Sequence, residues 1–414
     1  MAWRWRALAT GGASPSPRSS FASTFYDGKL VVAGGLGELV VAGRQTHDDV
    51  LELDIELRRW RTLKITRLGN PAPTMAGRAL FGSVGINEKI YIHGGTDRRT
   101  GHTTFEDVLE LDVRRATMRT LPTVAASVGE DPGPLFGQAM AAFGDSLWVF
   151  GGARARGKPG LSADIYQLEL PVGSGTFATW RKLDASGFMP YARQEACLLA
   201  APASPELYLF GGADSVQDYD DAYSFHTDTH RWERLVNAVD SSAASRSRAA
   251  CALLPLPATD NNAGEGPAAT YALLVHGGFN DTGKHDLVQQ MHLGPGPNAW
   301  RWSELRSTRS VGTLPPAARM GHTIHVVNAS FAVGFGGEAE RVKCTACAGD
   351  PLNDVFVGVP SWLVAKAMRV DEVNTEASDG KRSRSMDEGR TETLRAKAAE
   401  RRRNQNHRGA KIEL

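Results

Sequence analysis

Arginine recurs at one place in a long internal repeat. The members of this set are Arg18, Arg78, Arg193, Arg248 and Arg319. Arg18 and Arg78 each precede a Gly-Gly pair by 16 residues, and Leu135 stands at the equivalent place of the third repeat. A guanidinium group binds carboxylates and phosphates through paired hydrogen bonds. The set therefore predicts a partner-binding face for an anionic ligand or an acidic protein segment. The alternative is that each arginine pairs with a nearby acid or carbonyl and holds its own repeat in place.

Aspartate recurs as well, once in each repeat. This second set is Asp49, Asp107, Asp164, Asp221, Asp286 and Asp354. One carboxylate at one position of every repeat indicates a structural acceptor for loop amides, not a catalytic group. Asp214 and Asp218 lie in a short loop that also holds Asp220, and such a loop could bind a cation through its carboxylates. The spacing is not that of an EF-hand, which favours a solvated acidic loop.

The four cysteines offer a second candidate metal or redox site. Cys344 and Cys347 form a single Cys-x-x-Cys, whereas a structural zinc site usually has two such pairs or added histidines. Cys197 and Cys251 fall inside predicted strands, where we expect them to be buried apolar side chains. Four cysteines without a secretory signal favour a reducing compartment. We expect no cofactor.

Six Gly-Gly pairs, 57 to 66 residues apart, mark the repeat that positions these residues. The pairs are Gly34-Gly35, Gly94-Gly95, Gly151-Gly152, Gly211-Gly212, Gly277-Gly278 and Gly336-Gly337. A period of this size indicates a repeat architecture. A short apolar run precedes each pair, and an acidic residue opens another strand after it. A further strand with an aromatic residue and Leu three positions later completes most units.

The last unit lacks this aromatic segment, and the start of the chain supplies it as Trp5-Arg-Ala-Leu8. We therefore expect the N-terminal strand, residues 3–8, to complete the last unit and close a ring. The four-stranded unit resembles the kelch repeat over residues 1–360, with units like those of Rab-effector-like and host-cell-factor-like proteins. The resemblance implies an all-β, six-bladed kelch β-propeller closed by the N-terminal strand, with a short charged C-terminal tail.

Residues 361–414 contain 13 Lys and Arg against 9 Asp and Glu, and we expect a mostly disordered tail with one helix over 391–403. The net charge of the whole chain is +1, which does not favour nucleic acid. No apolar run is long enough for a membrane span. We expect a cytoplasmic monomer, with the nucleus as the alternative location because Arg401–Arg403 resembles an import patch.

Long loops follow the Gly-Gly pairs on one face of the expected ring, and such loops commonly carry function. We therefore expect a non-catalytic protein-interaction scaffold or adaptor that binds its partner there. Two alternatives remain open. One is a metal-dependent, specifier-like enzyme that uses iron or zinc, and the other is a protein that binds a small anionic ligand at the central channel. The apolar segment 39–43 is expected to form an extra strand or a patch for a partner.

Overall fold

A computed structural model gives the architecture of the ring. Met1–Val359 form one unit and Pro360–Leu414 a separate one. The predicted tail, its helix over 391–403, and the Cys344/Cys347 pair lie outside the described residues. The structure describes residues 3–40, 43–97, 104–154, 160–172, 176–202, 204–235, 244–256, 271–286, 288–293, 301–304, 316–327, 331–339 and 350–360.

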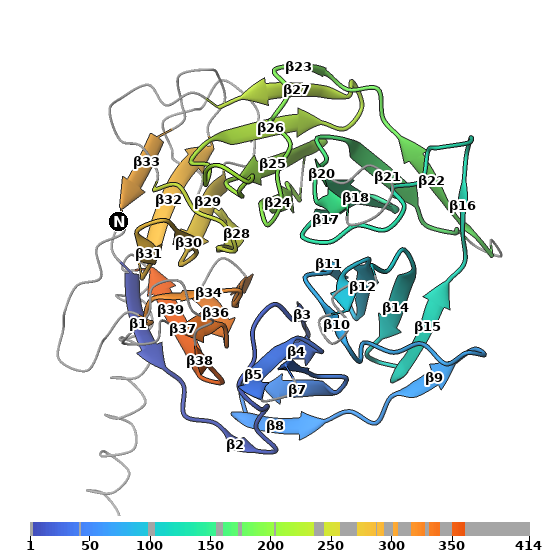
Figure 1. Cartoon of the computed structure of the whole chain (residues 1–414). Coiled ribbons are helices and arrows are strands. Elements are labelled where there is room, and N and C mark those ends of the chain that lie inside the picture. Colours follow the sequence, from blue (N-terminus) through green and yellow to red (C-terminus); the bar gives the residue numbers. More distant parts are fainter. Residues whose placement is uncertain are drawn as a thin grey trace, which may run out of the picture. The chain divides into compact units, whose positions relative to one another are not determined.

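Six antiparallel sheets form a ring of blades, which confirms the expected all-β propeller (Figure 1). The strands are given below for each blade from the centre of the ring outward. Blade 1 contains β3 (Ala22–Tyr26), β4 (Lys29–Ala33), β7 (Val50–Asp54) and β8 (Arg59–Thr62). Blade 2 contains β11 (Gly82–Ile86), β12 (Lys89–His93), β14 (Val108–Asp112) and β15 (Thr117–Leu121). Blade 3 contains β17 (Ala139–Phe143), β18 (Ser146–Phe150), β21 (Ile165–Glu169) and β22 (Ala178–Lys182).

The other three blades follow the same order. Blade 4 contains β24 (Cys197–Ala200), β25 (Glu206–Phe210), β26 (Ala222–His226) and β27 (Arg231–Arg234). Blade 5 contains β28 (Ala250–Pro255), β29 (Tyr271–His276), β32 (Val288–Leu293) and β33 (Arg301–Glu304). Blade 6 contains β35 (Thr323–Val327), β36 (Phe331–Phe335), β39 (Val355–Pro360) and β1 (Trp3–Ala7).

Short strands extend the blades at the rim and in the loops. Four of them run parallel to the outermost strands of blades 1 to 4, namely β2 (Gly11–Gly12), β9 (Thr66–Leu68), β16 (Thr123–Ala125) and β23 (Ser186–Gly187). The others pair within the loops: β5 (Leu36–Val40) with β6 (Gly43–Thr46), β10 (Arg78–Ala79) with β13 (Thr96–Asp97), β19 (Ala153–Arg154) with β20 (Gly160–Leu161), β30 (Phe279–Asn280) with β31 (Gly283–Lys284), and β34 (Arg319–Met320) with β37 (Glu338–Ala339) and β38 (Asp350–Pro351). The described residues of segment 39–43 thus lie in two paired strands, Leu39 and Val40 in β5 and Gly43 in β6, and an extra strand is one of the two expected forms.

The N-terminal strand closes the ring, as the sequence predicts. β1 forms the outer edge of blade 6 beside β39, and the Leu8 amide donates to the Val355 carbonyl at 2.8 Å. Trp3 and Trp5 have 0% and 1% of their surface exposed and pack in the core shared by blades 5 and 6. The β1 strand therefore covers an edge that would otherwise expose unpaired backbone groups.

The Gly-Gly pairs are the joints between neighbouring blades. The amide of Gly212 in blade 4 donates to the carbonyl of Arg246, which leads into blade 5, at 3.0 Å. Gly211 has φ 65°, and a Cβ there would lie 2.6 Å from the same carbonyl oxygen. Only glycine fits this close approach. The same amide-to-carbonyl bond recurs from Gly95 to Leu135, Gly152 to Arg193, Gly278 to Arg319, and Gly337 to Arg18.

The joint between blades 1 and 2 uses the side chain of Asp48 in place of this bond. One carboxylate oxygen accepts the amide of Met75 at 2.8 Å, and the other accepts the Thr74 hydroxyl at 2.8 Å. Arg67 forms an ion pair with the same carboxylate at 2.9 Å. Asp48 therefore fastens the segment that leads into blade 2 to the loop of blade 1.

Candidate partner-binding face

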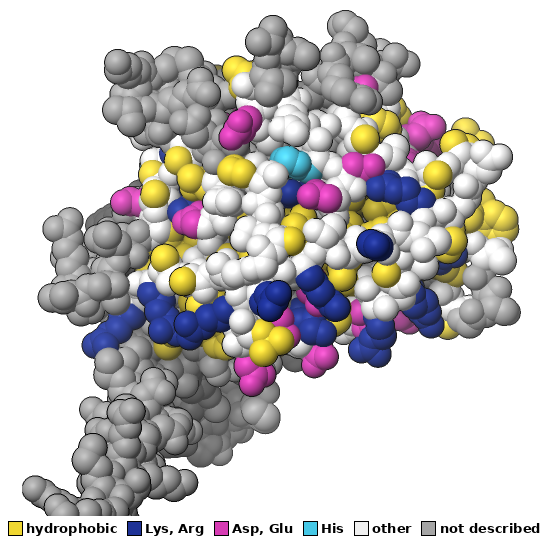
Figure 2. All heavy atoms as spheres, turned by 90° about the horizontal axis from the view of Figure 1, so that it is seen from below, with side chains coloured by type: hydrophobic (Ala, Val, Ile, Leu, Met, Phe, Trp, Pro, Cys, Tyr) yellow, Lys and Arg dark blue, Asp and Glu magenta, His cyan; other side chains and the backbone are white. Residues whose placement is uncertain are grey.

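The antiparallel blades give the ring two unlike faces. The connections between second and third strands, together with the segments that lead into each blade, lie on one face, which we call the loop-rich face. The remaining connections form the tight-turn face. Arg58 and Arg114 are exposed in tight turns of blades 1 and 2, and Figure 2 shows Lys and Arg side chains gathered toward one edge of the rim.

Four of the five predicted arginines are buried, and each binds backbone and side-chain groups of its own blade. We call an arginine in this role a pin. At most 2% of the surface of Arg18, Arg78, Arg193 or Arg319 is exposed. Each guanidinium group donates to a carbonyl of its own Gly-Gly pair and to the recurring aspartate of its blade. The bonds from the guanidinium groups to Gly carbonyls measure 2.9 to 3.0 Å, and the partners are Gly34 with Asp49, Gly94 with Asp107, Gly211 with Asp221, and Gly336 with Asp354.

In blade 5 the arginine in this role is Arg246. The sequence analysis placed Arg248 in the set, and that assignment is wrong. Arg246 is 1% exposed and donates to Gly277 O at 2.9 Å and to the side-chain oxygen of Gln289. The insertion in blade 5 lengthens the spacing to the Gly-Gly pair, and the sequence Arg-Ser-Arg offers two candidates two positions apart. Gln289 also takes the acceptor role expected of Asp286. No carboxylate among the described residues pairs with Arg246, and burial lowers its pKa to about 10.

The positive charge of Arg18 is balanced by a carboxylate of its own blade. Burial alone would raise the pKa of Asp49, but the hydrogen bonds and charge of Arg18 outweigh burial and hold that pKa below its usual value. In blade 3, where Leu135 is the lead-in residue, Lys182 pairs with Asp164 at 2.8 Å. The contacts of these arginines thus fit the alternative in which each one holds its own repeat in place. An acidic partner segment was expected because the arginines were taken to be available to a ligand, and their burial removes that reason.

Two residues after each pin arginine, and two residues after Leu135 in blade 3, the backbone forms a ring of residues around the central channel. We call this ring the collar. All six collar residues have left-handed backbone angles, with φ between 50° and 68°: Ser20, Leu80, Gly137, Glu195, Arg248 and Gly321. Amide-to-carbonyl bonds of 2.6 to 3.0 Å run from Ser20 to Gly321, Gly321 to Arg248, Arg248 to Glu195, Glu195 to Gly137, and Gly137 to Leu80. A non-glycine residue in this conformation costs about 1–2 kcal/mol, which these bonds offset. Arg248 therefore belongs to the collar, where it also donates to the Ser20 hydroxyl at 2.7 Å.

Beyond the collar lies a cavity of about 510 Å³, lined by the first strands of all six blades. Its polar wall is a cluster in which His325 Nε2 lies 2.9 Å from the Ser23 hydroxyl and 3.0 Å from the Thr323 hydroxyl. Burial lowers the pKa of His325 to about 4, so the ring is neutral at pH 7. The described residues that line this cavity include no Lys or Arg. The described wall thus presents hydroxyl and imidazole groups, without a Lys or Arg side chain, to a small ligand.

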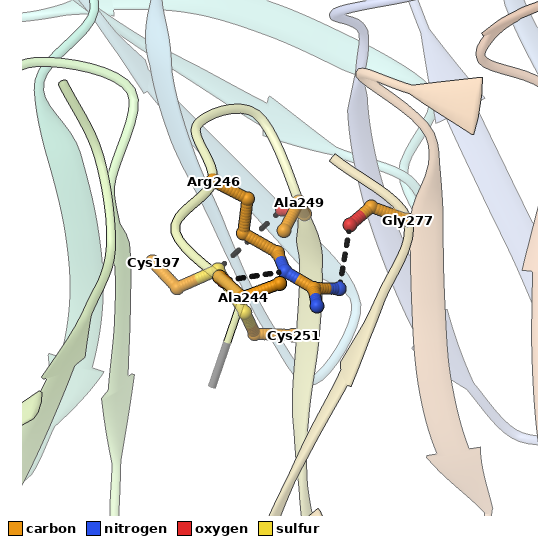
Figure 3. The surroundings of a disulfide bond; sticks show 6 residues. All are labelled: Cys197, Ala244, Arg246, Ala249, Cys251 and Gly277. Atoms are coloured by element: carbon orange, nitrogen blue, oxygen red, sulfur yellow. Dashed lines mark hydrogen bonds between the residues drawn. A yellow bond between two sulfur atoms is a disulfide. The ribbon is translucent and has the colours of Figure 1, made fainter. Parts of the chain in front are cut away.

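A disulfide between Cys197 of β24 and Cys251 of β28 joins the inner strands of blades 4 and 5 (Figure 3). The sequence interpretation of both residues as separate apolar side chains is therefore wrong. Their Cα atoms lie 6.2 Å apart on neighbouring strands, which is within the range that a disulfide spans. Sequence alone could not give this distance, because the two cysteines are 54 positions apart.

The acidic loop of blade 4 is organised by hydrogen bonds within the loop. Asp214 accepts the Tyr219 hydroxyl at 2.6 Å and the amides of Val216 and Gln217 at 2.7 and 2.8 Å. Asp218, the other candidate cation ligand, lies in the same loop. Across the described part of the chain, no group of three or more His, Cys, Asp or Glu side chains is placed to hold a metal ion.

Two segments of blade 4 carry exposed apolar side chains. Phe188, Met189 and Tyr191 lie in the segment that leads into the blade, and Val216 lies at the tip of its long loop; we call these four residues the blade-4 patch. Their exposed fractions are 69%, 44%, 70% and 87%. Tyr191 stacks on the buried Tyr219 with ring centroids 6.3 Å apart. The sequence analysis missed this patch, because the residues share no spacing.

Known proteins share this repeat. A family model described as the KLHDC2/KLHL20/DRC7 Kelch-repeats domain matches residues 1–152 and 69–255. The chain is a member of the kelch-repeat family. The resemblance noted in the sequence is thereby confirmed. No helix that the structure describes is long and apolar enough to cross a bilayer.

Curated relatives of this kelch propeller carry names of different kinds. It is 25% identical to the host cell factor homolog hcf-1 of Caenorhabditis elegans, over 56% of this chain and 29% of that protein. It is 26% identical to the Rab9 effector protein with kelch motifs of Rattus norvegicus, over 52% and 54%. It is 28% identical to an N-acetylneuraminate epimerase of Escherichia coli, over 44% and 52%. In each of these three matches, the chain spans about half of the relative or less.

Proposed function

We propose that this kelch propeller is a non-catalytic interaction module that binds a protein partner on its loop-rich face, at the blade-4 patch. One observation carries the proposal: four exposed apolar side chains lie in two segments of a single blade, the segment that leads into it and its long loop. Exposed aromatic side chains on a rigid support are typical of the residues that dominate binding energy at protein interfaces.

The surrounding framework supports this function. The pins, the collar and the disulfide hold the inner part of the ring, so the loops of blade 4 rest on a preorganised base. Preorganised surfaces lose little conformational freedom on binding. The names of two relatives, an effector protein and a host cell factor homolog, agree with an interaction role.

A site-specific crosslinking experiment tests the proposal. A photoreactive amino acid replaces Val216 on the loop-rich face, and a matched protein carries it at Leu57, which is 72% exposed in a tight turn of blade 1. We expect one specific partner to be crosslinked in cells from position 216 and not from position 57, and to be lost when Tyr191→Ala is added. Equal crosslinking from both positions, or none from position 216, contradicts the proposal.

A further inference from the structure

We propose that the central cavity is a second binding site, which takes a small neutral polyol such as a monosaccharide. This inference goes beyond the proposed function and does not depend on a partner at the blade-4 patch. The cavity has a volume of about 510 Å³, and pockets that bind small molecules commonly measure roughly 300–1,000 Å³. Its wall combines hydroxyl groups, strand edges and buried polar atoms that match the chemistry of such a ligand.

The charge of the wall favours a neutral ligand. The described residues that line the cavity include no Asp, Glu, Lys or Arg. At the collar, Arg248 and Glu195 lie 3.8 Å apart, so their charges balance each other. An ion that entered the cavity would give up its water shell without gaining a counter-ion, which is costly. A neutral molecule avoids this cost.

A cluster of hydroxyl and imidazole groups forms the polar side of the wall, on blades 6 and 1. The Ser23 and Thr323 hydroxyl oxygens lie 2.7 Å apart, and His325 Nε2 lies 2.9 and 3.0 Å from them. A hydroxyl group has one donor and two acceptor sites, and these mutual bonds use only part of that capacity in either tautomer of the imidazole. All three side chains are partly exposed. The cluster can therefore bind a hydroxyl group of a ligand.

Backbone groups of the inner strands add to the polar wall. The first strand of every blade stands at the inner end of its sheet and pairs on one side only within the described sheets; these strands are β3, β11, β17, β24, β28 and β35 (Figure 1). An edge strand presents a row of N–H and C=O groups. A polyol carries many hydroxyl groups that both donate and accept, so it can bind such a row, whereas a hydrocarbon would cover these groups without hydrogen bonds.

Two buried side chains offer further polar atoms to a ligand, and they lie on opposite blades of the ring. Gln138 of blade 3 and His322 of blade 6 line the cavity and are 5% and 8% exposed. Gln138 Nε2 donates to the His93 carbonyl at 2.7 Å, and His322 Nε2 lies 2.7 Å from His276 Nδ1. Gln138 Oε1 and His322 Nδ1 have no hydrogen-bond partner among the described residues. A buried polar atom without a partner is destabilising, and ligand hydroxyl groups would satisfy both atoms.

The other side of the cavity is apolar. Ala142 of blade 3, Leu199 and Ala200 of blade 4, and Leu253 of blade 5 line it and are partly exposed. A sugar ring has C–H faces beside its hydroxyl groups. These faces can pack on the apolar side chains while the hydroxyl groups reach the polar cluster, so a monosaccharide matches both sides of the wall.

Ligand-observed NMR with defined sugars tests this inference on the full chain. The neutral probes are glucose, galactose and N-acetylglucosamine, and their charged twins are glucuronate, galacturonate and glucosamine. We expect saturation transfer from the protein to at least one neutral probe, with a Kd in the millimolar range or tighter. The charged twin of that probe should bind at least tenfold more weakly, because the described wall offers it no counter-ion.

Matched variants locate the binding in the cavity. Ser23→Ala removes a hydroxyl group from the polar cluster and should raise the Kd of the bound probe at least threefold. Ala142→Leu adds volume to the wall and should raise that Kd at least tenfold. The same two changes at exposed rim positions, Ser186→Ala and Ala125→Leu, are the controls and should leave the Kd unchanged.

Three results would each overturn the inference. They are the absence of saturable binding for all three neutral probes, equal binding of a neutral probe and its charged twin, and a Kd that both cavity variants leave unchanged. Thermal melts identify a variant that fails to fold, and the other cavity variant then decides. Crosslinking from position 216 reports on a different surface, so a negative result here leaves the proposed function standing.

Discussion

Arg193 joins Gly152 to the next blade through a single backbone bond, with the Gly152 amide donating to the Arg193 carbonyl at 2.8 Å. The side chain of the same residue turns into its own blade, where it binds Gly211 O and Asp221. One residue thus contributes its backbone to the joint and its side chain to the pin. The repetition of this arrangement in other blades accounts for the recurrence of the arginines.

Replacing a pin should destabilise the whole ring. Arg193→Met leaves Asp221, whose side chain is 7% exposed, without its counter-ion. Such a loss typically costs about 3–5 kcal/mol of unfolding free energy. Urea unfolding measures this cost, and Arg181→Met is the control because its pair with Glu169 is solvent-exposed and worth less than about 1 kcal/mol. Equal effects of the two changes would contradict the pin assignment.

Supplying the missing carboxylate in blade 5 should stabilise the protein. Gln289→Glu places a negative charge beside Arg246, whose pKa burial lowers to about 10. The new carboxyl is expected to have a pKa below its unfolded value of about 4.3. A gain of about 1–2 kcal/mol should then be present at pH 7 and lost as the pH falls through the folded pKa of this group.

Thermal melts at pH 7 and pH 3 measure this gain. Gln217→Glu, on an exposed loop, is the control and should change little. A variant that is no more stable than the parent at pH 7 would show that Arg246 needs no counter-ion.

The joint between blades 1 and 2 should depend on Asp48. Asp48→Ala leaves the Met75 amide and the Thr74 hydroxyl without their acceptor and removes the partner of Arg67. We expect a loss of about 2–3 kcal/mol, with increased hydrogen exchange confined at first to blades 1 and 2. Glu56→Ala, at an exposed tight turn of blade 1, is the comparison. Uniform exchange across all blades would argue against a local joint.

The disulfide should stabilise the ring between blades 4 and 5. In the chain-entropy account, a crosslink between positions 54 residues apart raises the free energy of the unfolded chain by about 4 kcal/mol. Mass spectrometry of unreduced peptides should find Cys197 joined to Cys251, and reduction should lower the Tm. The double change Cys197→Ala with Cys251→Ala should melt at the lower Tm and no longer respond to reductant. Free thiols in protein purified without reductant would refute the pairing.

The sequence predicted the features that repeat and missed those that depend on proximity. The Gly-Gly pairs and the Trp5 segment predicted six blades and their closure, because each is a local pattern with a fixed place in its unit. The spacing does not distinguish Arg246 from Arg248, because an insertion breaks it in blade 5. The collar was missed because its residue types differ from blade to blade, although their backbone angles agree. The blade-4 patch depends on exposure, which has no periodic signal.

Closure by β1 makes the start of the chain a determinant of stability. Trp5→Ala removes a side chain that is 1% exposed, and large aromatic deletions in a core cost about 3–5 kcal/mol. Deletion of residues 1–9 should cost more, because it also exposes the edge of β39. Calorimetry measures both effects, with Leu57→Ala as an exposed control. An unchanged Tm after the deletion would show that β1 is not needed for closure.

The pairing of β1 with β39 also sets an order of events on the ribosome. Leu8 is made first, yet its partner Val355 emerges almost 350 residues later. At synthesis rates of about 5–20 residues per second, the nascent β1 waits roughly twenty seconds to a minute for its neighbour. During that interval Trp3 and Trp5 lack Phe356, which is part of the core they occupy in the finished ring. The last blade is thus completed by a segment that is synthesised before the other five blades.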